Sequence, residues 1–508
     1  HGFELHEVYS NQTATRQEVV YYFSLPETAV ITGVWLGDEE GKQFDYRVAP
    51  RGAAQQVYQE QVQRQVDPAL VEQIGPSQYR LRIFPIEPVR QRWESNDTLT
   101  PTIEPGDDMH MWLEWQVIEQ DGVIPMPSLS VLRNVYWDSQ SVRTLPGSLT
   151  ADVDRWLPAS MPSPNPQMAD HVVTFPDGRT VVAQASNATA PPLAADQKFA
   201  IVLDRSFSMG ELTSEVEATL STLEGLSPTA DIYLTASEFR GEAPSVKKLA
   251  DITSDDLVYF GGQNSASIMQ QFTEFGLGVA YDAIIVISDD GTFSTTANEV
   301  ETVAVPDSPV WMLHLGGVLP NGYDDNTLEI VQASGGGAAD SLDEILTRLA
   351  VSQSGQNADI INGYRWAVYP LGSNLDLPAE TVTHSPDDPF AKIAARQLIL
   401  AEMRANKGSI TDVALLDGLH EIAVDQAIVT PFSSMIVLVN DAQQRRLDEL
   451  EGKEDRFDRE VEEVGETAPG PTVTGVPEPE EWLLMILATA MLGWFLWNKR
   501  RPMQTVFG

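Results

Sequence analysis

The first part of the chain alternates apolar and polar residues in short runs. Glu18–Phe23 and Gln78–Phe84 are two such runs, and turn residues separate them from their neighbours. This period is typical of β-strands with one buried face, and a succession of short strands predicts a β-sandwich. The helix formers of Ala53–Val62 predict one helix inserted among the strands. We expect the sandwich to occupy residues 1–140.

The pattern changes after a connector at residues 141–195, which is rich in proline, serine and alanine and is expected to carry a few strands. From residue 196 to 350, short apolar strands alternate with helical stretches such as Glu211–Glu224. The expected strands are Ala200–Leu203, Ile232–Ala236, Ile284–Ser288 and Val310–Leu315. This alternation predicts a doubly wound α/β domain, in which helices cover both faces of a parallel sheet. Ligands then belong at the carboxyl ends of the strands.

Short oxygen-bearing side chains follow the first of these strands at alternate positions: Asp204, Ser206 and Ser208. A hard divalent cation such as Mg²⁺ prefers oxygen donors of this kind and keeps some coordination places for water. A later apolar strand ends in a second carboxylate, Asp289. The alternative is that Ser206 or Ser208 merely caps exposed N–H groups of a helix.

A glycine turn, Phe260–Ser265, lies between these two motifs and could close the site from a third loop. Residues of about 196 to 350 therefore resemble a von Willebrand factor A domain with its metal-ion-dependent adhesion site. The resemblance implies metal ligands at Asp204, Ser206, Ser208 and Asp289. The threonine that this family carries in the middle loop is replaced here by Gln263, so that either Gln263 or Asn264 would supply the oxygen. Loss of the threonine hydroxyl would imply a static site.

The sandwich region carries a second resemblance. Its segments Phe23–Pro26, Val48–Ala53, Pro68–Glu72 and Phe84–Pro88, taken in order, resemble the vault protein inter-alpha-trypsin (VIT) domain. The resemblance implies a non-catalytic interaction module that is coupled to a following A domain, which is the order found here.

Residues 355–440 return to strands and helices, including an expected helix at Asp388–Asn406. The run Ile428–Val439 is similar to the segment that follows A domains in the inter-alpha-trypsin heavy-chain group, and we interpret it as a strand that completes a β layer. Its hydroxyls, such as Ser433, have no base beside them in sequence, and we interpret His420 as a packing or surface residue. Nucleophilic catalysis needs a base within reach, so we expect no enzyme activity.

Residues 441–475 are dense in alternating charge, and their few apolar residues predict a solvated acidic stalk and linker. The following segment, 476–501, contains the apolar run Trp482–Trp497, which would span roughly 24 Å as a helix. A buried core helix, the alternative, would not explain the tryptophans at both ends or the basic cluster Lys499, Arg500 and Arg501. That cluster places the C-terminus in the cytoplasm and the bulk of the chain outside.

The motif Pro477, Glu478 and Pro479 precedes this apolar run. The order of motif, apolar helix and basic cluster resembles the PEP-CTERM sorting signal, and the chain as a whole resembles PEP-CTERM integral membrane proteins. The resemblance implies recognition by an exosortase in a bacterial envelope, with uncleaved membrane anchoring as the alternative. The chain opens at His1 without a leader-like segment, so we expect an export signal upstream.

The composition limits which classes of partner and of chemistry are expected. The chain of 508 residues has 74 acidic and 32 basic side chains, a net charge of −42, and this charge disfavours nucleic acid because such binding needs cationic contacts. It contains no cysteine, which excludes disulfides, iron–sulfur clusters and thiol catalysis.

The fold class expected is a multidomain α+β protein with a sandwich, an A domain, a stalk and one transmembrane helix. We expect an envelope-anchored adhesion or ligand-binding protein, with Mg²⁺ (or Mn²⁺ or Ca²⁺) completing its coordination with a carboxylate of a protein or other surface ligand. The alternative is a scaffold or assembly factor of the exosortase-linked export system, with a structural or vacant metal site. Hydrolysis by a metal-activated water is a third hypothesis, which the lack of a general base in the motifs disfavours.

Overall fold

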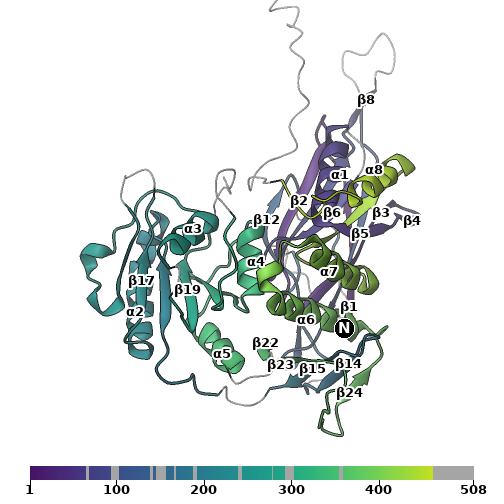
Figure 1. The fold of residues 1–508 in the computed structure, drawn as a ribbon. Helices are drawn as coiled ribbons and strands as arrows, with labels where there is room; N and C mark the ends of the chain where they lie inside the picture. The colour runs from purple at the N-terminus through teal and green to yellow at the C-terminus, as the bar shows by residue number, and fades with distance from the viewer. Residues whose placement is uncertain are drawn as a thin grey trace, which may run out of the picture. The chain divides into compact units, whose positions relative to one another are not determined.

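The structure is a computed structural model that describes residues 1–460, except 65–67, 93–101, 138–140, 145–155, 165–166, 187–190, 238–242, 277–278, 292–301 and 354–357. All described residues belong to one compact unit, His1–Glu466, and the second unit, Thr467–Gly508, contains none. Sheets and helices of this first unit are shown in Figure 1.

The N-terminal region is a β-sandwich of two sheets. One sheet has the order β1 (Gly2–Tyr9), β10 (Met109–Val117), β3 (Ala29–Asp38), β4 (Gly41–Phe44). The other has the order β12 (Ser128–Arg133), β2 (Gln17–Ser24), β7 (Gln78–Ile86), β6 (Pro68–Gln73), β25 (Ser433–Leu438), β5 (Tyr46–Pro50). Phe23 and Leu81 of the larger sheet share a core with Trp115 of the smaller one, and none of the three is more than 2% exposed.

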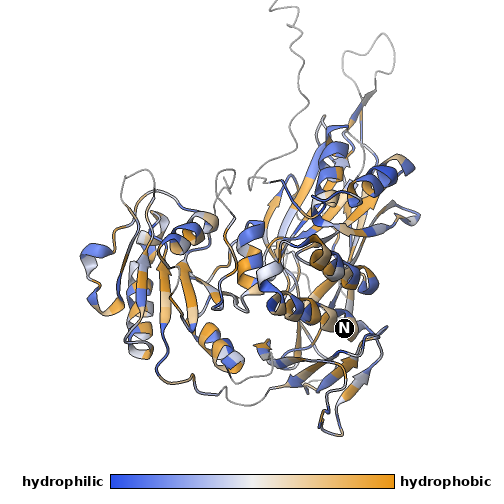
Figure 2. Ribbon diagram, in the orientation of Figure 1, coloured by the Kyte–Doolittle hydropathy of each residue, from blue (hydrophilic) through white to orange (hydrophobic). Residues whose placement is uncertain are grey.

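The burial pattern along a strand shows whether one face or both faces of its sheet are covered. Along β1, exposed and partly covered residues alternate, as expected where one face meets solvent. The central strands β6 and β7 are buried at every position, because helix α1 (Arg51–Gln63) contacts the sandwich on the side away from its core. Figure 2 shows the apolar residues concentrated on the strands.

A strand from the far end of the chain completes the sandwich. β25 pairs antiparallel with β6, where Met435 lies opposite Val71, and with β5, where Met435 lies opposite Val48. Met435 and Val71 are fully buried in the sandwich core. The folded sandwich therefore includes residues far beyond position 140.

The second region is an α/β domain. Its sheet has the order β18 (Ser245–Lys248), β17 (Asp231–Leu234), β16 (Phe199–Leu203), β19 (Ala283–Ser288), β20 (Val310–His314), β21 (Gly337–Ala339). All neighbours are parallel except the edge strand β18. Helices α2 (Thr213–Leu226) and α5 (Leu342–Gln353) share a core with one face, and helices α3 (Ser265–Gly276) and α4 (Asp325–Ala333) share a core with the other (Figure 1). This is the doubly wound sheet that the alternating pattern predicted.

A third sheet combines the connector with the segment after the α/β domain. Its order is β22 (Ala358–Ile361), β23 (Tyr364–Tyr369), β15 (Thr180–Ala185), β14 (His171–Thr174), β24 (Val382–His384). Helices α6 (Pro389–Ala405) and α7 (Val413–Gln426) pack in the same core, which also contains Trp366 and Phe432. Two short ribbons, β8 (Arg90–Arg92) with β9 (Thr102–Glu104) and β11 (Val123–Pro125) with β13 (Ser160–Pro162), complete the described strands.

The expected solvated stalk over residues 441–475 is wrong for its described part, up to residue 460. Helix α8 (Asp441–Glu451) packs on the sandwich and buries Leu447 and Leu450, which are at most 1% exposed. Its charges pair with other elements, as in the ion pair of 2.7 Å between the Arg446 guanidinium and the Glu60 carboxylate of α1. The two leucines, three residues apart, lie on one face of the helix, and that face was sufficient for docking.

Candidate functional site: the edge of the α/β sheet

Asp204 lies at the carboxyl edge of the α/β sheet, directly after β16. The strand Phe199–Leu203 is completely buried, and the Asp204 backbone N–H continues the ladder by donating to the Ile287 carbonyl at 2.9 Å. The Asp204 side chain is also fully buried. Its Oδ1 accepts from the Ser206 backbone N–H at 2.8 Å, and its Oδ2 accepts from the Ser288 hydroxyl at 2.7 Å. The carboxylate is thereby oriented before any ligand arrives.

The two motif serines face each other beside this carboxylate. Their hydroxyls are hydrogen-bonded to each other, with the two oxygens 3.2 Å apart. Neither the 3₁₀ turn Ser208–Leu212 nor helix α2 has a side-chain capping hydrogen bond at its N-terminus. Ser206 and Ser208 therefore do not cap these helices, which was the alternative interpretation. Neighbouring ligands of an octahedral Mg²⁺ lie about 3 Å apart, given metal–oxygen distances of about 2.1 Å. The serine pair fits such a cation.

Asp289 lies at the end of the neighbouring strand β19 and is 5% exposed. Its Oδ1 accepts from the Gly291 backbone N–H at 3.0 Å. Burial raises the pKa of Asp204 to about 6, the charge of Asp289 adds to this rise, and hydrogen bonds from Ser288 and Ser206 oppose it. A divalent cation would offset the cost of holding two buried carboxylates together.

The middle-loop residues have other partners. The Gln263 side-chain oxygen accepts from the Thr235 hydroxyl at 2.7 Å, and its amide nitrogen donates to the Ala236 carbonyl at 2.9 Å. The Asn264 side-chain oxygen accepts from the backbone N–H and the hydroxyl of Ser267, in the first turn of α3, at 2.8 and 2.9 Å. The two amide oxygens thus hold the loop and the helix start. The other four candidate ligands, Asp204, Ser206, Ser208 and Asp289, follow the ends of the neighbouring strands β16 and β19.

A buried histidine supports Asp289, and the sequence reasoning did not find it. The His314 Nδ1–H donates to the Asp289 backbone carbonyl, and the Tyr323 hydroxyl donates to His314 Nε2 at 2.6 Å. Burial lowers the pKa of His314 to about 4, so the imidazole is neutral at neutral pH. The Tyr323 backbone N–H in turn donates to the Ile74 carbonyl of the sandwich at 2.7 Å. Only the position of His314 at the end of an apolar strand could have signalled this role.

Among the described residues, no group of three or more histidine, cysteine, aspartate or glutamate side chains has the arrangement of a metal site. A cation at the sheet edge would therefore depend on the two carboxylates together with the serine hydroxyls. Those four residues, Asp204, Ser206, Ser208 and Asp289, fit a hard divalent cation by the chemistry of their oxygens.

The described residues include a serine–histidine pair whose serine is buried. His420 Nδ1 lies 2.8 Å from the Ser433 hydroxyl, although the sequence showed no base beside this serine. Ser433 is fully buried on β25, and burial lowers the pKa of His420 to about 4. The pair joins α7 to the sandwich sheet.

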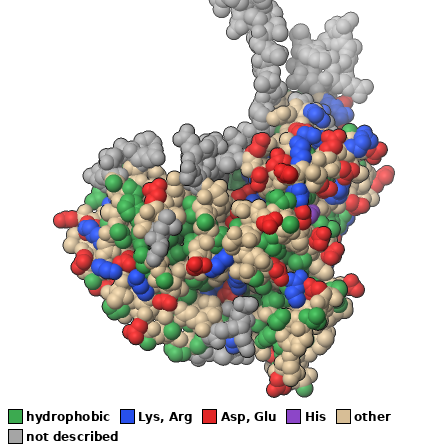
Figure 3. Space-filling model, in the orientation of Figure 1, with side chains coloured by type: hydrophobic (Ala, Val, Ile, Leu, Met, Phe, Trp, Pro, Cys, Tyr) green, Lys and Arg blue, Asp and Glu red, His purple; other side chains and the backbone are tan. Residues whose placement is uncertain are grey.

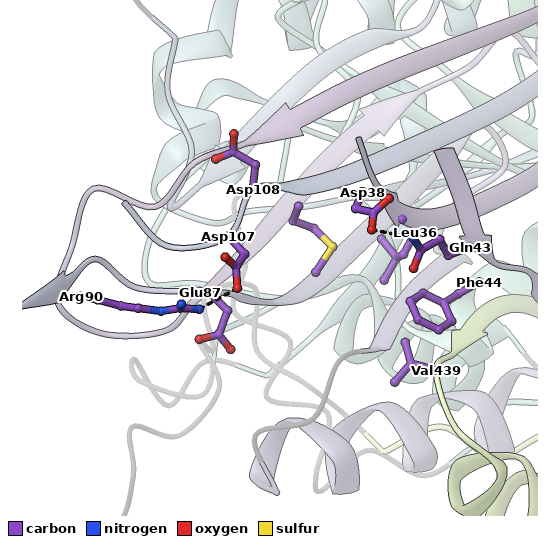
Figure 4. A pocket seen from close by; sticks show the side chains of 11 residues that line it. Leu36, Asp38, Gln43, Phe44, Glu87, Arg90, Asp107, Asp108 and Val439 are labelled. Atoms are coloured by element: carbon purple, nitrogen blue, oxygen red, sulfur yellow. Dashed lines mark hydrogen bonds and ion pairs between the residues drawn. The ribbon is translucent and has the colours of Figure 1, made fainter. Parts of the chain in front are cut away.

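A surface pocket of about 460 Å³ lies on the sandwich (Figure 4). Phe44, Met109 and Val439 line it together with carboxylates, and Arg90 pairs with Asp107 across 2.6 Å. It holds no histidine, serine or threonine. Acidic side chains are spread over the visible face with basic ones among them (Figure 3), so carboxylates alone do not mark a site.

Two groups of candidate residues lie outside the described part of the chain. They are the sorting motif Pro477, Glu478 and Pro479, and the anchor residues Trp482, Trp497, Lys499, Arg500 and Arg501. None of the described helices is both long enough and apolar enough to cross a membrane.

Comparisons with known proteins agree with the sandwich assignment. Residues 2–94 match the family model described as the vault protein inter-alpha-trypsin domain. A solved structure similar to this chain is the crystal structure of the ArnB paralog VWA2 from Sulfolobus acidocaldarius. The two chains are 13% identical, the match covers 55% of this chain and 89% of that chain, and the TM-score is 0.23. No curated protein matches the chain. The chain thus combines a region that matches the VIT domain with a doubly wound α/β domain.

Proposed function

We propose that this protein binds a protein ligand through a divalent cation held at the edge of the α/β sheet. The observation that carries the proposal is the serine pair of Ser206 and Ser208, whose hydroxyls lie 3.2 Å apart beside the buried Asp204 and cap no helix. Together with Asp289 these side chains would hold Mg²⁺, with Mn²⁺ and Ca²⁺ as alternatives. A bound cation would supply a Lewis-acid coordination place for a ligand carboxylate.

The protein residues contribute orientation of the two carboxylates. Ser288 and the Ser206 backbone fix Asp204, and His314 fixes the Asp289 backbone. None of these groups is placed as an exposed general base, which supports binding without turnover.

The cellular setting belongs to the same proposal. We infer an envelope protein that is anchored by Trp482–Trp497, with the basic cluster in the cytoplasm and the described domains outside. The motif Pro477–Pro479 supports handling by an exosortase.

A scaffold role is the second candidate. The observation that favours it is Gln263, whose side-chain amide is hydrogen-bonded at both ends to Thr235 and Ala236. A middle loop held in this way favours a site that does not change state. In a scaffold, partners would remain bound without the metal.

Calorimetric titration of Mg²⁺ and Mn²⁺ into the full chain tests the proposal. We expect saturable binding that is lost in Asp204→Asn and in the double variant Ser206→Ala with Ser208→Ala. Asp425→Asn, which removes an exposed carboxylate from α7, is the matched control and should bind normally. Absence of binding in the wild-type chain, or equal binding in all variants, would refute the metal site and leave the scaffold role.

A further inference from the structure

Two aromatic side chains lie exposed beside the candidate metal site. Phe207 is 72% exposed and Phe260 is 44% exposed. A single exposed apolar residue is ordinary on a protein surface. Two phenylalanines on adjoining loops, next to a set of metal-binding oxygens, form a surface that a partner can cover.

The two loops are held together, so the aromatic pair has a defined place. The Phe207 backbone N–H donates to the Gly261 carbonyl at 2.8 Å, and the Phe260 backbone N–H donates to the Arg205 carbonyl at 2.8 Å. The Arg205 guanidinium donates to the Thr235 carbonyl at the end of β17, 2.6 Å away. Because the backbones are held, the loops themselves lose little conformational entropy when a ligand packs on the two rings.

Other apolar side chains extend this surface. Val258 is 38% exposed and lies two residues before Phe260, and Val318 is 53% exposed in the loop that follows β20. That loop leaves the sheet at the same carboxyl edge as Asp204, because β16, β19 and β20 are parallel. We call Phe207, Val258, Phe260 and Val318 the apolar rim.

The charges around the site limit how acidic a ligand can be. Glu211 is exposed within the turn that follows Ser208, and Asp290 is partly exposed next to Asp289. Without a cation, this edge of the sheet repels a carboxylate. With a cation, one ligand carboxylate can be bound, while further carboxylates on the ligand would meet Glu211 and Asp290.

We propose that the site recognises a protein segment that presents one carboxylate between large apolar side chains, which pack on the apolar rim. This inference rests on the proposed function, because the carboxylate needs the cation. It adds a selectivity that the metal alone cannot supply: segments rich in acidic residues bind weakly, although each offers carboxylates.

The test uses three fluorescein-labelled peptides of equal length with one central aspartate, flanked by leucine and phenylalanine, by glycines, or by glutamates. Fluorescence anisotropy with the full chain in saturating Mg²⁺ measures their affinities, and EDTA measures the metal-free background. We expect the apolar-flanked peptide to bind at least about tenfold more tightly than the glycine peptide, and the glutamate peptide to bind most weakly.

The variants separate the rim from the metal. Phe207→Ala and Phe260→Ala should each weaken binding of the apolar-flanked peptide by about tenfold and leave Mg²⁺ binding in calorimetry unchanged. Phe275→Ala is the matched control, since Phe275 is 43% exposed in the same domain, ten residues along α3 from the start of that helix at Ser265. It should change neither measurement.

The outcomes distinguish the two proposals. If the wild-type chain does not bind Mg²⁺ in calorimetry, the proposed function is refuted. If Mg²⁺ binding is normal, any of three results refutes the apolar-rim inference alone. These results are equal affinities for the three peptides, no EDTA-sensitive peptide binding, and rim variants that bind like Phe275→Ala.

Discussion

Replacement of Arg459 by methionine should destabilise the protein because this side chain joins three elements in the interior. Arg459 follows α8 and is only 7% exposed. Its Nε lies 3.0 Å from an oxygen of Asp325 on α4, its Nη1 lies 3.5 Å from Glu72 on β6, and its Nη2 donates to the Gln73 carbonyl at 3.3 Å. Burial acts to raise the pKa of Asp325, but Arg459 and Arg51 hold it below its usual value.

The magnitude follows from what remains after the change. Removal of one partner from a buried ion pair typically costs about 3–5 kcal/mol, because the other charge stays buried without compensation. Glu72 retains Arg80 and Arg82, whose Nη2 atoms lie 2.8 and 3.0 Å from it, and Asp325 retains Arg51 at 3.4 Å. We therefore expect the lower end, a loss of about 3 kcal/mol in the free energy of unfolding.

Urea unfolding followed by tryptophan fluorescence measures this loss as a shift in midpoint at unchanged slope. The matched control is Arg90→Met, since Arg90 is 57% exposed and pairs with Asp107 at the surface, where such a pair contributes at most about 1 kcal/mol. Arg459→Met combined with Asp325→Leu should recover part of the loss, because the uncompensated carboxylate is then removed as well. If Arg459→Met shifts the midpoint no more than Arg90→Met, the buried cluster does not stabilise the structure as argued.

Three further predictions concern the site and pH. Tyr323→Phe should weaken Mg²⁺ binding by about tenfold in calorimetry, because His314 loses the donor that orients it; unchanged affinity would contradict this support role. Gln263→Thr should cost about 1–2 kcal/mol in urea unfolding, because hydrogen bonds of the side-chain amide are lost; a variant as stable as the wild type would show that the amide is not needed. Burial, together with the neighbouring His384, lowers the pKa of His171 from 6.5 to about 4, so protonation favours the unfolded state. The stability that this neutral histidine contributes is complete above pH 6.5 and is lost as pH falls toward 4. Between pH 7.5 and 4.5, the thermal unfolding temperature of His171→Gln should therefore decline less than that of the wild type. An equal decline would show that His171 is not the residue responsible.

Much of the sheet edge could be predicted because its residues are adjacent to their strands in sequence. Asp204 follows the buried run Phe199–Leu203 directly, and Asp289 follows Ser288, the last residue of β19. In a parallel sheet such positions meet at one edge whatever the rest of the fold does. The middle loop was different, because the choice of partner for Gln263 depends on Thr235 and Ala236, which β17 brings beside it.

The stalk shows where local pattern reasoning fails. A helix with two leucines among many charges has too little apolar surface to form a core alone, and α8 does not form one. It contributes Leu447 and Leu450 to a core made by other elements, and Arg446 finds Glu60 on α1. Such complementary surfaces exist only once the sandwich has formed.

Residue spacing within a few positions was enough to predict most strand and helix types, the doubly wound α/β domain and the oxygen-rich strand ends, because these features depend on local pattern. The run Ile428–Val439 was predicted to complete a β layer, but only the packed structure shows that this layer is the N-terminal sandwich, where β25 pairs with β5 and β6. It also shows that His314 and Tyr323 support Asp289 and that Arg459 lies between Glu72 and Asp325. Several of these contacts join residues that are hundreds of positions apart, and all of them depend on which buried polar groups meet once the sheets and helices pack.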